Sequence, residues 1–504
     1  MATPLAILRP ILGFLPEIRS PASPPVFSQR LLWTGAALFI FYTMYNVLAL
    51  GIDPSIGDTS SFLQVVTASR IGSLITVGIG PIVLASIFLQ LFVGAKILAV
   101  DMHNPEEKAL FHGTQKLLAI LLCFFEAYIF VMLSGLPMYT DPTTGAMLFG
   151  DLTPYFVVLQ IALGSMILLF LDEIVSKYGI GSGISLFIAA GVAMAIVGGT
   201  INIFFGEGGA VSALSEGGAQ IIAKELEILL PIFFTALVFL VIVYVEGIKV
   251  EIPLAFERAR GVGTGFPIKF MYVSNIPVIL AFALLANFQF LAMALVGQNL
   301  CIGGTLDTSV ADKAYACQGG IDLINVIGRA EGGGTSGGQA QFVDGLLYLV
   351  SPVHRVQGVA YSSQIDQYLT YKTPIFHIPQ WVHIVVYISF LVVLCVIFGQ
   401  FWVETTGMGA ADVAKQLDSA GLQVPGYRRD PRIVTAILEK YIPPIVVMGS
   451  AFVGILAGLA DLTGALGTGT GILLTVGIVY RMYQDIENQN VLSQNMMLSK
   501  LFGK

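Results

Sequence analysis

The sequence predicts an all-α protein that crosses a membrane ten times. Of its 504 residues, 56% are hydrophobic and 11% are charged, and the mean hydropathy is +0.82. A soluble core cannot absorb that much apolar surface, so the composition indicates a polytopic membrane protein. A membrane-spanning helix needs about 20 apolar residues. Apolar runs of about this length occur near residues 31–51, 77–98, 116–136, 154–172, 184–204, 228–246, 271–297, 380–403, 441–460 and 467–484.

The stretch from Phe62 to Leu98 is longer than one ordinary span, and its first third carries polar residues. Val77 to Leu98 alone is long enough to cross the bilayer, which leaves Phe62 to Thr76 as a separate short helix. A short segment bearing Arg70 is tolerated at membrane depth only inside protein or a wet cavity. We therefore expect the chain to surround a cavity that holds this segment.

Outside the apolar runs, the chain shows little sign of a second packed domain. Residues 3–18 alternate apolar turns with charged residues, which predicts a short helix lying on the membrane surface. The N-terminus has no pattern of a cleavable signal, so the first span itself is expected to direct targeting. The glycine-rich run at 329–341 is typical of a flexible insertion.

Positive charge sets the expected orientation. If the N-terminus lies in the cytosol, 19 of the 25 Lys and Arg residues lie on the cytosolic side or at its boundary, and six lie outside. The opposite orientation reverses this count, so we expect both termini in the cytosol. Ten spans also divide into five and five, as an inverted repeat requires, although the residues alone do not establish that repeat.

Glycine or proline interrupts four apolar runs beside an isoleucine or leucine. The interruptions are GIGPIV at 78–83, GIGSGISLFI at 179–188, NIPVI at 275–279 and GTGTGILL at 467–474. Each one alone is typical of a packing or kink site, because small residues let membrane helices approach closely. Together they suit a constriction of aliphatic side chains, which excludes water and ions by dewetting.

Several motifs spread over most of the chain belong to one known pattern. They are TASRIG followed by GIGPIV and QLFVG, LDEIVSKYGIGSGISLFIAAGV at 171–192, VEIPLAFERARG and PIKFMYVSNIPVIL within 250–280, FWVETTG at 401–407, and LTVGIVYRMY at 474–483. These stretches resemble the SecY family of archaeal type, the central (alpha) subunit of the Sec protein-conducting channel. The resemblance implies ten transmembrane helices in two inverted five-helix halves around a central hourglass pore, with a short plug helix.

The resemblance also implies a function and partners. The expected function is a passive pore that secretes unfolded polypeptides across the membrane and releases transmembrane segments laterally into lipid, driven by a partner such as the ribosome. The implied partners are two small single-span Sec subunits (SecE/gamma type and beta type), the ribosome and its RNA, the signal recognition particle receptor pathway, nascent polypeptides and membrane lipid. The expected location is the plasma membrane.

The same resemblance assigns roles to individual residues. It places six aliphatic residues in a pore ring, namely Ile79, Val83, Ile184, Ile188, Ile279 and Leu474. It places Thr67, Ser69 and Arg70 in the plug, for which an ordinary interfacial helix is the alternative. Glu126 and Asn287 match positions where polar residues line the lateral gate and set the hydrophobicity that a segment needs to leave sideways. Leu84 stands where the family often has a hydroxyl, so the tuning of that threshold stays open.

Two expected cytosolic loops concentrate positive charge. The first carries Lys249, Arg258, Arg260 and Lys269, and the second carries Arg428, Arg429 and Arg432. Positive residues hold loops in the cytosol whatever their partners, so topology alone explains both loops. The resemblance adds ribosome binding, in which Arg and Lys neutralise RNA phosphates with little sequence preference. Of these residues, we expect Arg260 and Arg428 to be central.

The four cysteines divide into two pairs. Cys123 and Cys395 fall in apolar runs, where a buried small hydrophobic residue is expected. Cys301 and Cys317 lie in the long outer connection and can form a disulfide in an oxidising setting, with two free thiols as the plain alternative.

The sequence shows no sign of catalytic chemistry. It contains no nucleotide-binding loop, no metal-ligand spacing of His and Cys and no paired intramembrane acids, so we expect no enzyme activity, no cofactor and no metal. The main rival to a channel is a secondary transporter, which also uses broken helices and inverted repeats. A transporter is expected to place ion ligands or a charge at the midplane, where this chain has mostly aliphatic residues. A membrane scaffold without a pore is the third alternative.

The expected organisation follows from these features. The chain begins with an N-terminal amphipathic surface segment (1–30), followed by an N-terminal half with spans one to five (31–204) that includes the plug (62–76). A hinge and outer connection (205–227) leads to the C-terminal half (228–490), which contains the cytosolic loops 246–270 and 404–440 and the long outer loop 298–379. A cytosolic tail (491–504) ends the sequence.

Overall fold

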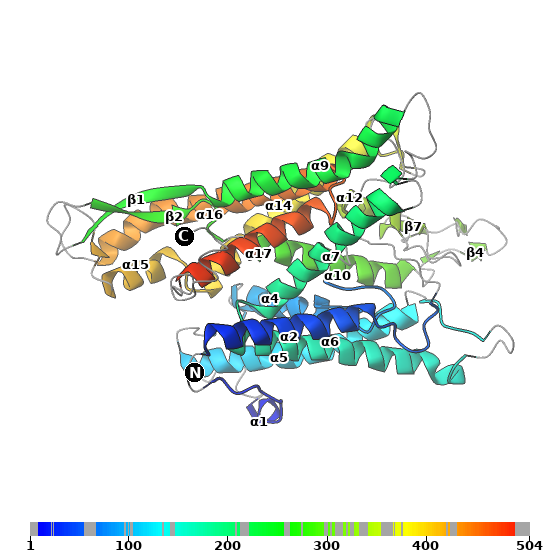
Figure 1. Ribbon diagram of the computed structural model, residues 1–504, viewed down its shortest axis with the longest axis horizontal. Coiled ribbons are helices and arrows are strands. Elements are labelled where there is room, and N and C mark those ends of the chain that lie inside the picture. Colours follow the sequence, from blue (N-terminus) through cyan, green and yellow to red (C-terminus); the bar gives the residue numbers. More distant parts are fainter. Residues whose placement is uncertain are drawn as a thin grey trace.

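The fold is that of an elongated helical protein, and most of its long helices run along the longest axis (Figure 1). The computed structural model describes residues 9–488 apart from 22, 24, 55–66, 95–96, 99, 101–103, 134–135, 142–146, 207–208, 212–220, 257–262, 274–275, 297–300, 303–304, 308–315, 319–320, 323–326, 332–340, 354–365, 367, 374–375, 420–421 and 424–430.

A helix occupies each of the ten apolar runs within the described residues. The first five are α2 (Phe27–Asn46), α4 (Gly80–Gly94), α5 (Pro105–Tyr128), α6 (Thr153–Tyr178) and α7 (Gly183–Phe205). The other five are α9 (Ile221–Glu246), α10 (Ile276–Val296), α14 (Gln380–Thr405), α16 (Pro431–Leu462) and α17 (Gly469–Asn488). By length and composition, six of these described helices can cross a membrane, namely α5, α6, α7, α9, α14 and α16, whereas α4 and α10 are shorter apolar helices.

Local sequence signals account for where α5 begins and how it ends. Asn104 is its N-cap, because its side chain accepts a hydrogen bond from the Glu106 amide, and Pro105 occupies the first helical position. After Tyr128 the helix passes directly into a π-helix, η2 (Ile129–Leu133). Such wide turns loosen the regular hydrogen-bond ladder and occur most often at functional positions.

The prediction of a short helix over residues 62–76 is wrong for its described part. Residues 62–66 lie outside the described part of the chain, and residues 67–79 form successive turns. Positive φ angles at Ala68 (50°), Gly72 (84°) and Gly78 (64°) explain this, because a right-handed helix cannot include them. The segment instead pairs with the chain that follows α2, where the Ala49 amide donates to the Gly72 carbonyl at 2.8 Å.

Most of the buried side chains form one large hydrophobic cluster that includes residues of α2, α4, α7, α9, α10, α14 and α17. Small residues permit the close crossing of α14 and α16. A Cβ added at Gly454 of α16 would lie 3.0 Å from the Val392 Cα of α14, so a larger residue there would push the helices apart.

Short elements gather at the two ends of the molecule. One end carries α15 (Ala410–Ser419) and a hairpin of β1 (Lys249–Phe256) and β2 (Gly263–Lys269), joined by β9 (Leu422–Gln423) (Figure 1). The short α1 (Arg9–Leu12) packs against α5. The other end carries α12 (Leu346–Val350) and three two-stranded sheets. Their strands are β3 (Cys301–Ile302), β4 (Thr305–Asp307), β5 (Ala316–Gln318), β6 (Ile321–Asp322), β7 (Arg329–Glu331) and β8 (Gln341–Asp344). The β7 and β8 strands flank the glycine-rich run expected to be flexible, of which residues 332–340 lie outside the described chain.

An ionic network holds the N-terminal segment against α5 and against the end of α6. Lys116 and Lys177 both bond the Glu173 carboxylate, at 2.6 and 2.9 Å. The Ile18 amide donates to the same carboxylate, and Lys116 donates to the Pro16 carbonyl at 2.5 Å. The chain entering α2 is therefore fixed to two other helices. Within the described residues, the expected surface helix is limited to the single turn of α1.

Candidate functional site

The six aliphatic residues expected in a ring belong to the one large hydrophobic cluster. Ile79, Val83, Ile188 and Leu474 are at most 5% exposed, and Ile184 and Ile279 are partly buried against them. They come from the starts of α4, α7, α10 and α17. Because α4 packs against α10 and α7 packs against α17, residues far apart in the sequence meet in the interior.

All four of these helices begin at the cluster. Ile79 immediately precedes α4, Ile184 and Ile188 lie in the first two turns of α7, Ile279 lies in the first turn of α10, and Leu474 lies in the second turn of α17. The glycine and proline interruptions in the sequence coincide with these starts. Their physical role is to end one segment and start the next inside the protein.

Two aspartates, the buried Asp461 and the partly buried Asp172, hold two of these helix starts, and the sequence analysis did not identify them. The Asp172 carboxylate on α6 accepts a hydrogen bond from the Ile184 amide at 2.8 Å. The Asp461 carboxylate on α16 accepts bonds from the Thr470 amide at 3.0 Å and from the Thr470 hydroxyl at 2.8 Å. Each aspartate therefore satisfies amide groups that a helix start leaves unpaired.

A signal for these junctions was present in the sequence. GIGSGISL at 179–186 and GTGTGILL at 467–474 share the spacing of three glycines, a hydroxyl residue and an isoleucine, and each follows an aspartate near the end of the preceding apolar run. Comparing the two stretches with each other, instead of reading each as an isolated kink, would have found the aspartates.

The turn segment at 67–79 lies directly before the cluster. The Thr67 and Ser69 hydroxyls are 2.7 Å apart and both residues are buried. The Ile79 amide donates to the Thr67 carbonyl at 2.9 Å, which ties the segment to the start of α4. A Cβ added at Gly78 would lie 2.2 Å from that carbonyl oxygen, so the segment fits only because residue 78 has no side chain.

Arg70 differs from its two buried neighbours. Its guanidinium donates to the Asn46 side chain at 3.1 Å and lies 5.9 Å from the centre of the Tyr45 ring, at the end of α2. The charge is therefore satisfied by polar and aromatic groups and is only partly buried.

The two expected gate residues lie on packed elements. Glu126 on α5 has a buried Oε1 atom that makes no hydrogen bond to the described residues, and a Cβ added at Gly80 would lie 3.1 Å from its Oε2 atom. Asn287 on α10 donates to the Ala283 carbonyl of its own helix at 2.8 Å. The α10 helix packs against both α4 and η2, so the wide π turn that follows Glu126 faces the second half of the chain.

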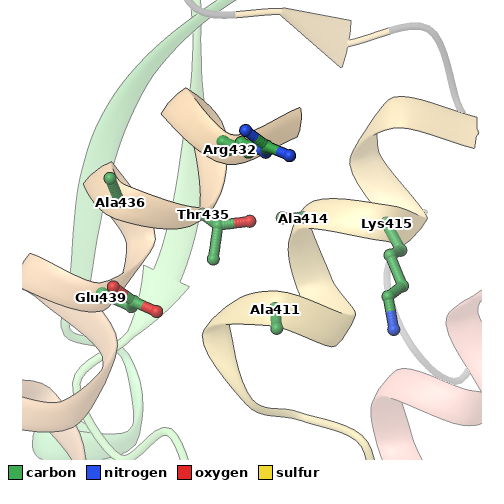
Figure 2. Close-up of a pocket in the computed structure, with 7 residues that line it drawn as sticks. All are labelled: Ala411, Ala414, Lys415, Arg432, Thr435, Ala436 and Glu439. Atoms are coloured by element: carbon green, nitrogen blue, oxygen red, sulfur yellow. The ribbon is translucent and has the colours of Figure 1, made fainter. Parts of the chain in front are cut away.

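Of the six residues expected to bind the ribosome, the structure describes two. Arg258, Arg260, Arg428 and Arg429 lie outside the described residues. Arg432 is exposed beside a shallow groove of about 300 Å³ between α15 and α16, whose lining residues Figure 2 shows. Lys269 is partly buried, and its ammonium donates to the Gln484 side chain at 2.6 Å.

Comparison with known proteins identifies the family of this arrangement. A profile of the SecY family matches residues 73–483. The chain belongs to the SecY family. It is 41% identical over 500 residues to the protein translocase subunit SecY of Methanocaldococcus jannaschii, with 99% of each chain covered. It is 36% identical to that of Pyrococcus furiosus and 33% identical to that of Haloferax volcanii, with 97% and 98% of both chains covered.

Solved structures agree with this assignment to the SecY family. The structure of a protein-conducting channel matches with a TM-score of 0.75 at 41% identity, covering 96% of this chain and 97% of the other. Sec61 in the canine ribosome-channel complex from the endoplasmic reticulum matches with a TM-score of 0.72 at 40% identity, with the same coverage. As a SecY of archaeal type, the chain is a multi-pass membrane protein and a subunit of a protein-translocation channel, as the motifs predicted.

The cysteine predictions have different outcomes. Cys123 and Cys395 are buried and free, as expected for small residues in apolar helices. Cys301 on β3 pairs in the sheet with Asp322, and Cys317 on β5 pairs with Leu306. The side chains of Cys301 and Cys317 are not among those that the structure describes, so their disulfide stays a prediction.

Proposed function

We propose that this SecY is a passive pore for unfolded polypeptides, closed by two barriers in series. The first is the ring of six aliphatic residues, and the second is a plug that includes Thr67, Ser69 and Arg70. The observation that carries the proposal is the convergence of four helix starts, which brings those aliphatic residues into one cluster. An aliphatic constriction excludes ions while it stays dry and can deform around a passing chain.

The proposal includes ten transmembrane helices in two inverted halves, 31–204 and 228–490, around an hourglass pore. The similar junctions at Asp172 and Asp461 support it, because they join the fourth helix to the fifth and the ninth to the tenth. We place the hinge at 205–227. Glu126 and Asn287 line the lateral gate through which hydrophobic segments leave for lipid.

The remaining parts of the proposal concern sidedness and partners. The end of the molecule with α15 and the β1–β2 hairpin faces the cytosol, because these elements belong to the sequence segments 246–270 and 404–440, which are rich in Lys and Arg. Both termini are then cytosolic, the membrane is the plasma membrane, and residues 1–30 and 491–504 form the surface segment and the tail.

In this proposal the chain is not an enzyme, and a partner supplies the energy. One similar structure is Sec61 in the canine ribosome-channel complex, which supports docking of the ribosome on Arg258, Arg260, Arg428, Arg429 and Arg432. The small Sec subunits and the signal recognition particle receptor pathway complete the expected partners.

A secondary transporter is the alternative, and ion conductance separates the two. We expect Ile79→Ser with Ile188→Ser to wet the ring and raise ion leak of the purified channel in a planar bilayer, because a hydroxyl holds water where a branched alkyl group does not. Gly78→Ala should unseat residues 67–69 and raise the leak independently. The ion leak of the combined variant should exceed the sum of the leaks of the ring variant and of Gly78→Ala.

Two substitutions serve as matched controls. Val197 on α7 is 55% exposed, so Val197→Ser adds a hydroxyl to the same helix away from the ring. A Cβ added at Gly198 meets nothing within 4 Å, so Gly198→Ala tests the alanine substitution alone. If the ring variants conduct no better than these controls while a small solute is still transported, the pore proposal is wrong.

A further inference from the structure

Lys269 is already bonded within the protein, unlike a surface lysine that is free to bind an external anion. It ends β2 and is partly buried, whereas Lys249, its cross-strand partner at the start of β1, is exposed. The Lys269 ammonium donates to the Gln484 Oε1 atom at 2.6 Å and lies 5.2 Å from the centre of the Tyr480 ring. Both partners belong to α17, so this lysine joins the base of the hairpin to that helix.

A buried carboxylate interacts electrostatically with the same lysine. Glu246, the last residue of α9, is 3% exposed, and the charges of Lys269 and Arg481 act on it. Its Oε1 atom makes no hydrogen bond within the described chain. Turning Lys269 outward to meet a phosphate would leave this carboxylate buried with one compensating charge fewer, which is costly.

The hairpin base is held on two sides. Ile268, one residue before Lys269, is 2% exposed and belongs to a separate hydrophobic cluster with residues of α15 and α16. Neighbouring strand residues point to opposite faces of the sheet. One face of the hairpin base therefore packs on α15 and α16, and Lys269 joins the other to α17. The bond from the Phe270 amide to the Ile248 carbonyl, at 2.9 Å, closes the base.

The α17 helix extends from this contact to the aliphatic ring. Leu474 precedes Tyr480 by six residues, which is roughly 9 Å along a helix. Asp461 holds the start of α17, and the helix packs against α7, which contributes Ile184 and Ile188. A rigid helix fixed at both ends passes a displacement at one end to the other, because packed interfaces do not deform continuously.

We propose that Lys269 is a positioning residue that transmits movement of the β1–β2 hairpin to the ring through α17. This inference rests on the proposed function for its readout, since Arg258 and Arg260 of the proposed docking surface lie between β1 and β2 in the sequence. It assigns Lys269 a role in coupling and removes it from the phosphate contacts.

The test compares ribosome docking with ribosome-dependent conductance in proteoliposomes that contain the full channel. Lys269→Met removes the charge and keeps a long apolar side chain over Tyr480. We expect its affinity for stalled ribosome-nascent-chain complexes to stay within about twofold, and the ribosome-dependent conductance to fall roughly tenfold, the loss typical of one charge-assisted hydrogen bond. Lys269→Arg should restore most of the conductance. Lys249→Met removes the same charge from the cross-strand position and should leave the conductance unchanged.

Several results would overturn the inference. If Lys269 meets RNA phosphates, Lys269→Met reduces the slope of log affinity against log salt by about one. Equal losses in Lys249→Met and Lys269→Met, or no rescue by Lys269→Arg, would also contradict coupling through α17.

A further experiment distinguishes failure of this inference from failure of the docking proposal. If Arg260→Glu and Arg428→Glu bind ribosomes like the parent at every salt concentration, the docking surface is wrong. The contact with α17 is still tested by thermal unfolding of the channel without ribosomes, in a double-mutant cycle of Lys269→Met and Gln484→Leu. Coupling requires the effects to be non-additive by roughly tenfold in the unfolding equilibrium, and additive effects would show that no such contact exists.

Discussion

The junction of α6 with α7 and the junction of α16 with α17 solve the same problem in the two halves of the chain. In each, a helix must begin inside the protein, where unpaired amide groups are expensive. Each places an aspartate of the first helix against the start of the second, and each brings the two backbones together at a glycine. A Cβ added at Gly183 would lie 2.4 Å from the Asp172 Cα, and one added at Gly469 would lie 2.2 Å from the Ala460 backbone.

The two junctions differ in how many helices they join. Asp461 also accepts a hydrogen bond from the Tyr387 hydroxyl on α14, so its carboxylate joins three helices. At the first junction a separate group joins the third helix, because the Thr34 hydroxyl on α2 accepts a hydrogen bond from the Ile180 amide. In the second half, therefore, the single carboxylate of Asp461 accepts the hydrogen bonds that join the helices, whereas in the first half Asp172 and Thr34 share this role.

The largest effect is expected from the glycines, because the atoms that a new Cβ would meet belong to the backbone. Gly469→Ala and Gly183→Ala should each lower the free energy of unfolding by about 3 kcal/mol, since overpacking forces the helices apart. Thermal unfolding of the purified channel in detergent measures this, with Gly198→Ala as the matched control. A tolerated alanine at Gly183 beside a disruptive one at Gly469 would show that the two junctions are not equivalent.

Removing the carboxylate should destabilise the protein to a different extent at the two junctions. Asp461→Ala leaves groups of two helices without their acceptor and should lower the free energy of unfolding by about 2 kcal/mol. Asp172→Ala should lower it by about half of that, because Thr34 still holds its side of the junction. The same unfolding measurement applies, and Asp→Asn at each position retains one acceptor oxygen and should lose less. If Asp461→Ala and Asp172→Ala lose the same free energy of unfolding, the two junctions do not differ in the way described.

The smallest effect concerns the tyrosine that sets the second junction apart. Tyr387→Phe removes one hydroxyl and should cost about 1 kcal/mol in the parent protein. In the Asp461→Ala background the same change should cost almost nothing, because the bond is already lost. A double-mutant cycle of unfolding free energies measures this, and a full penalty in both backgrounds would show that the hydroxyl acts through some other group.

The outcome of the sequence analysis depends on the kind of signal. The positions of the ten helices followed from apolar runs, because hydropathy directly reports burial in lipid or protein. The six residues proposed for the aliphatic ring were selected from family motifs, and all six belong to or pack against one hydrophobic cluster. The short helix at 62–76 failed over 67–76, because two left-handed backbone positions, Ala68 and Gly72, depend on contacts with other segments that no local pattern reveals.

The role of charged residues was harder to foresee than their number. Counting Lys and Arg residues treated Lys269 and Lys249 alike, but only the fold brings Gln484 and Tyr480 to one of them. Similarly, the shared glycine spacing after Asp172 and Asp461 marks the two junctions in the sequence, but only the structure shows that each carboxylate bonds the start of the next helix.

The sequence by itself determined the membrane environment, the helices, the family and the aliphatic character of the residues where those helices begin. These are properties of composition and of short spacing, which act within one segment of the chain. Only the tertiary structure decided which amides each of the two aspartates satisfies, how residues 67–79 turn, and which lysine joins the hairpin to α17. Those contacts connect residues from separate segments, and the energy of a buried polar group depends on the partner that it meets and not on its neighbours in the sequence.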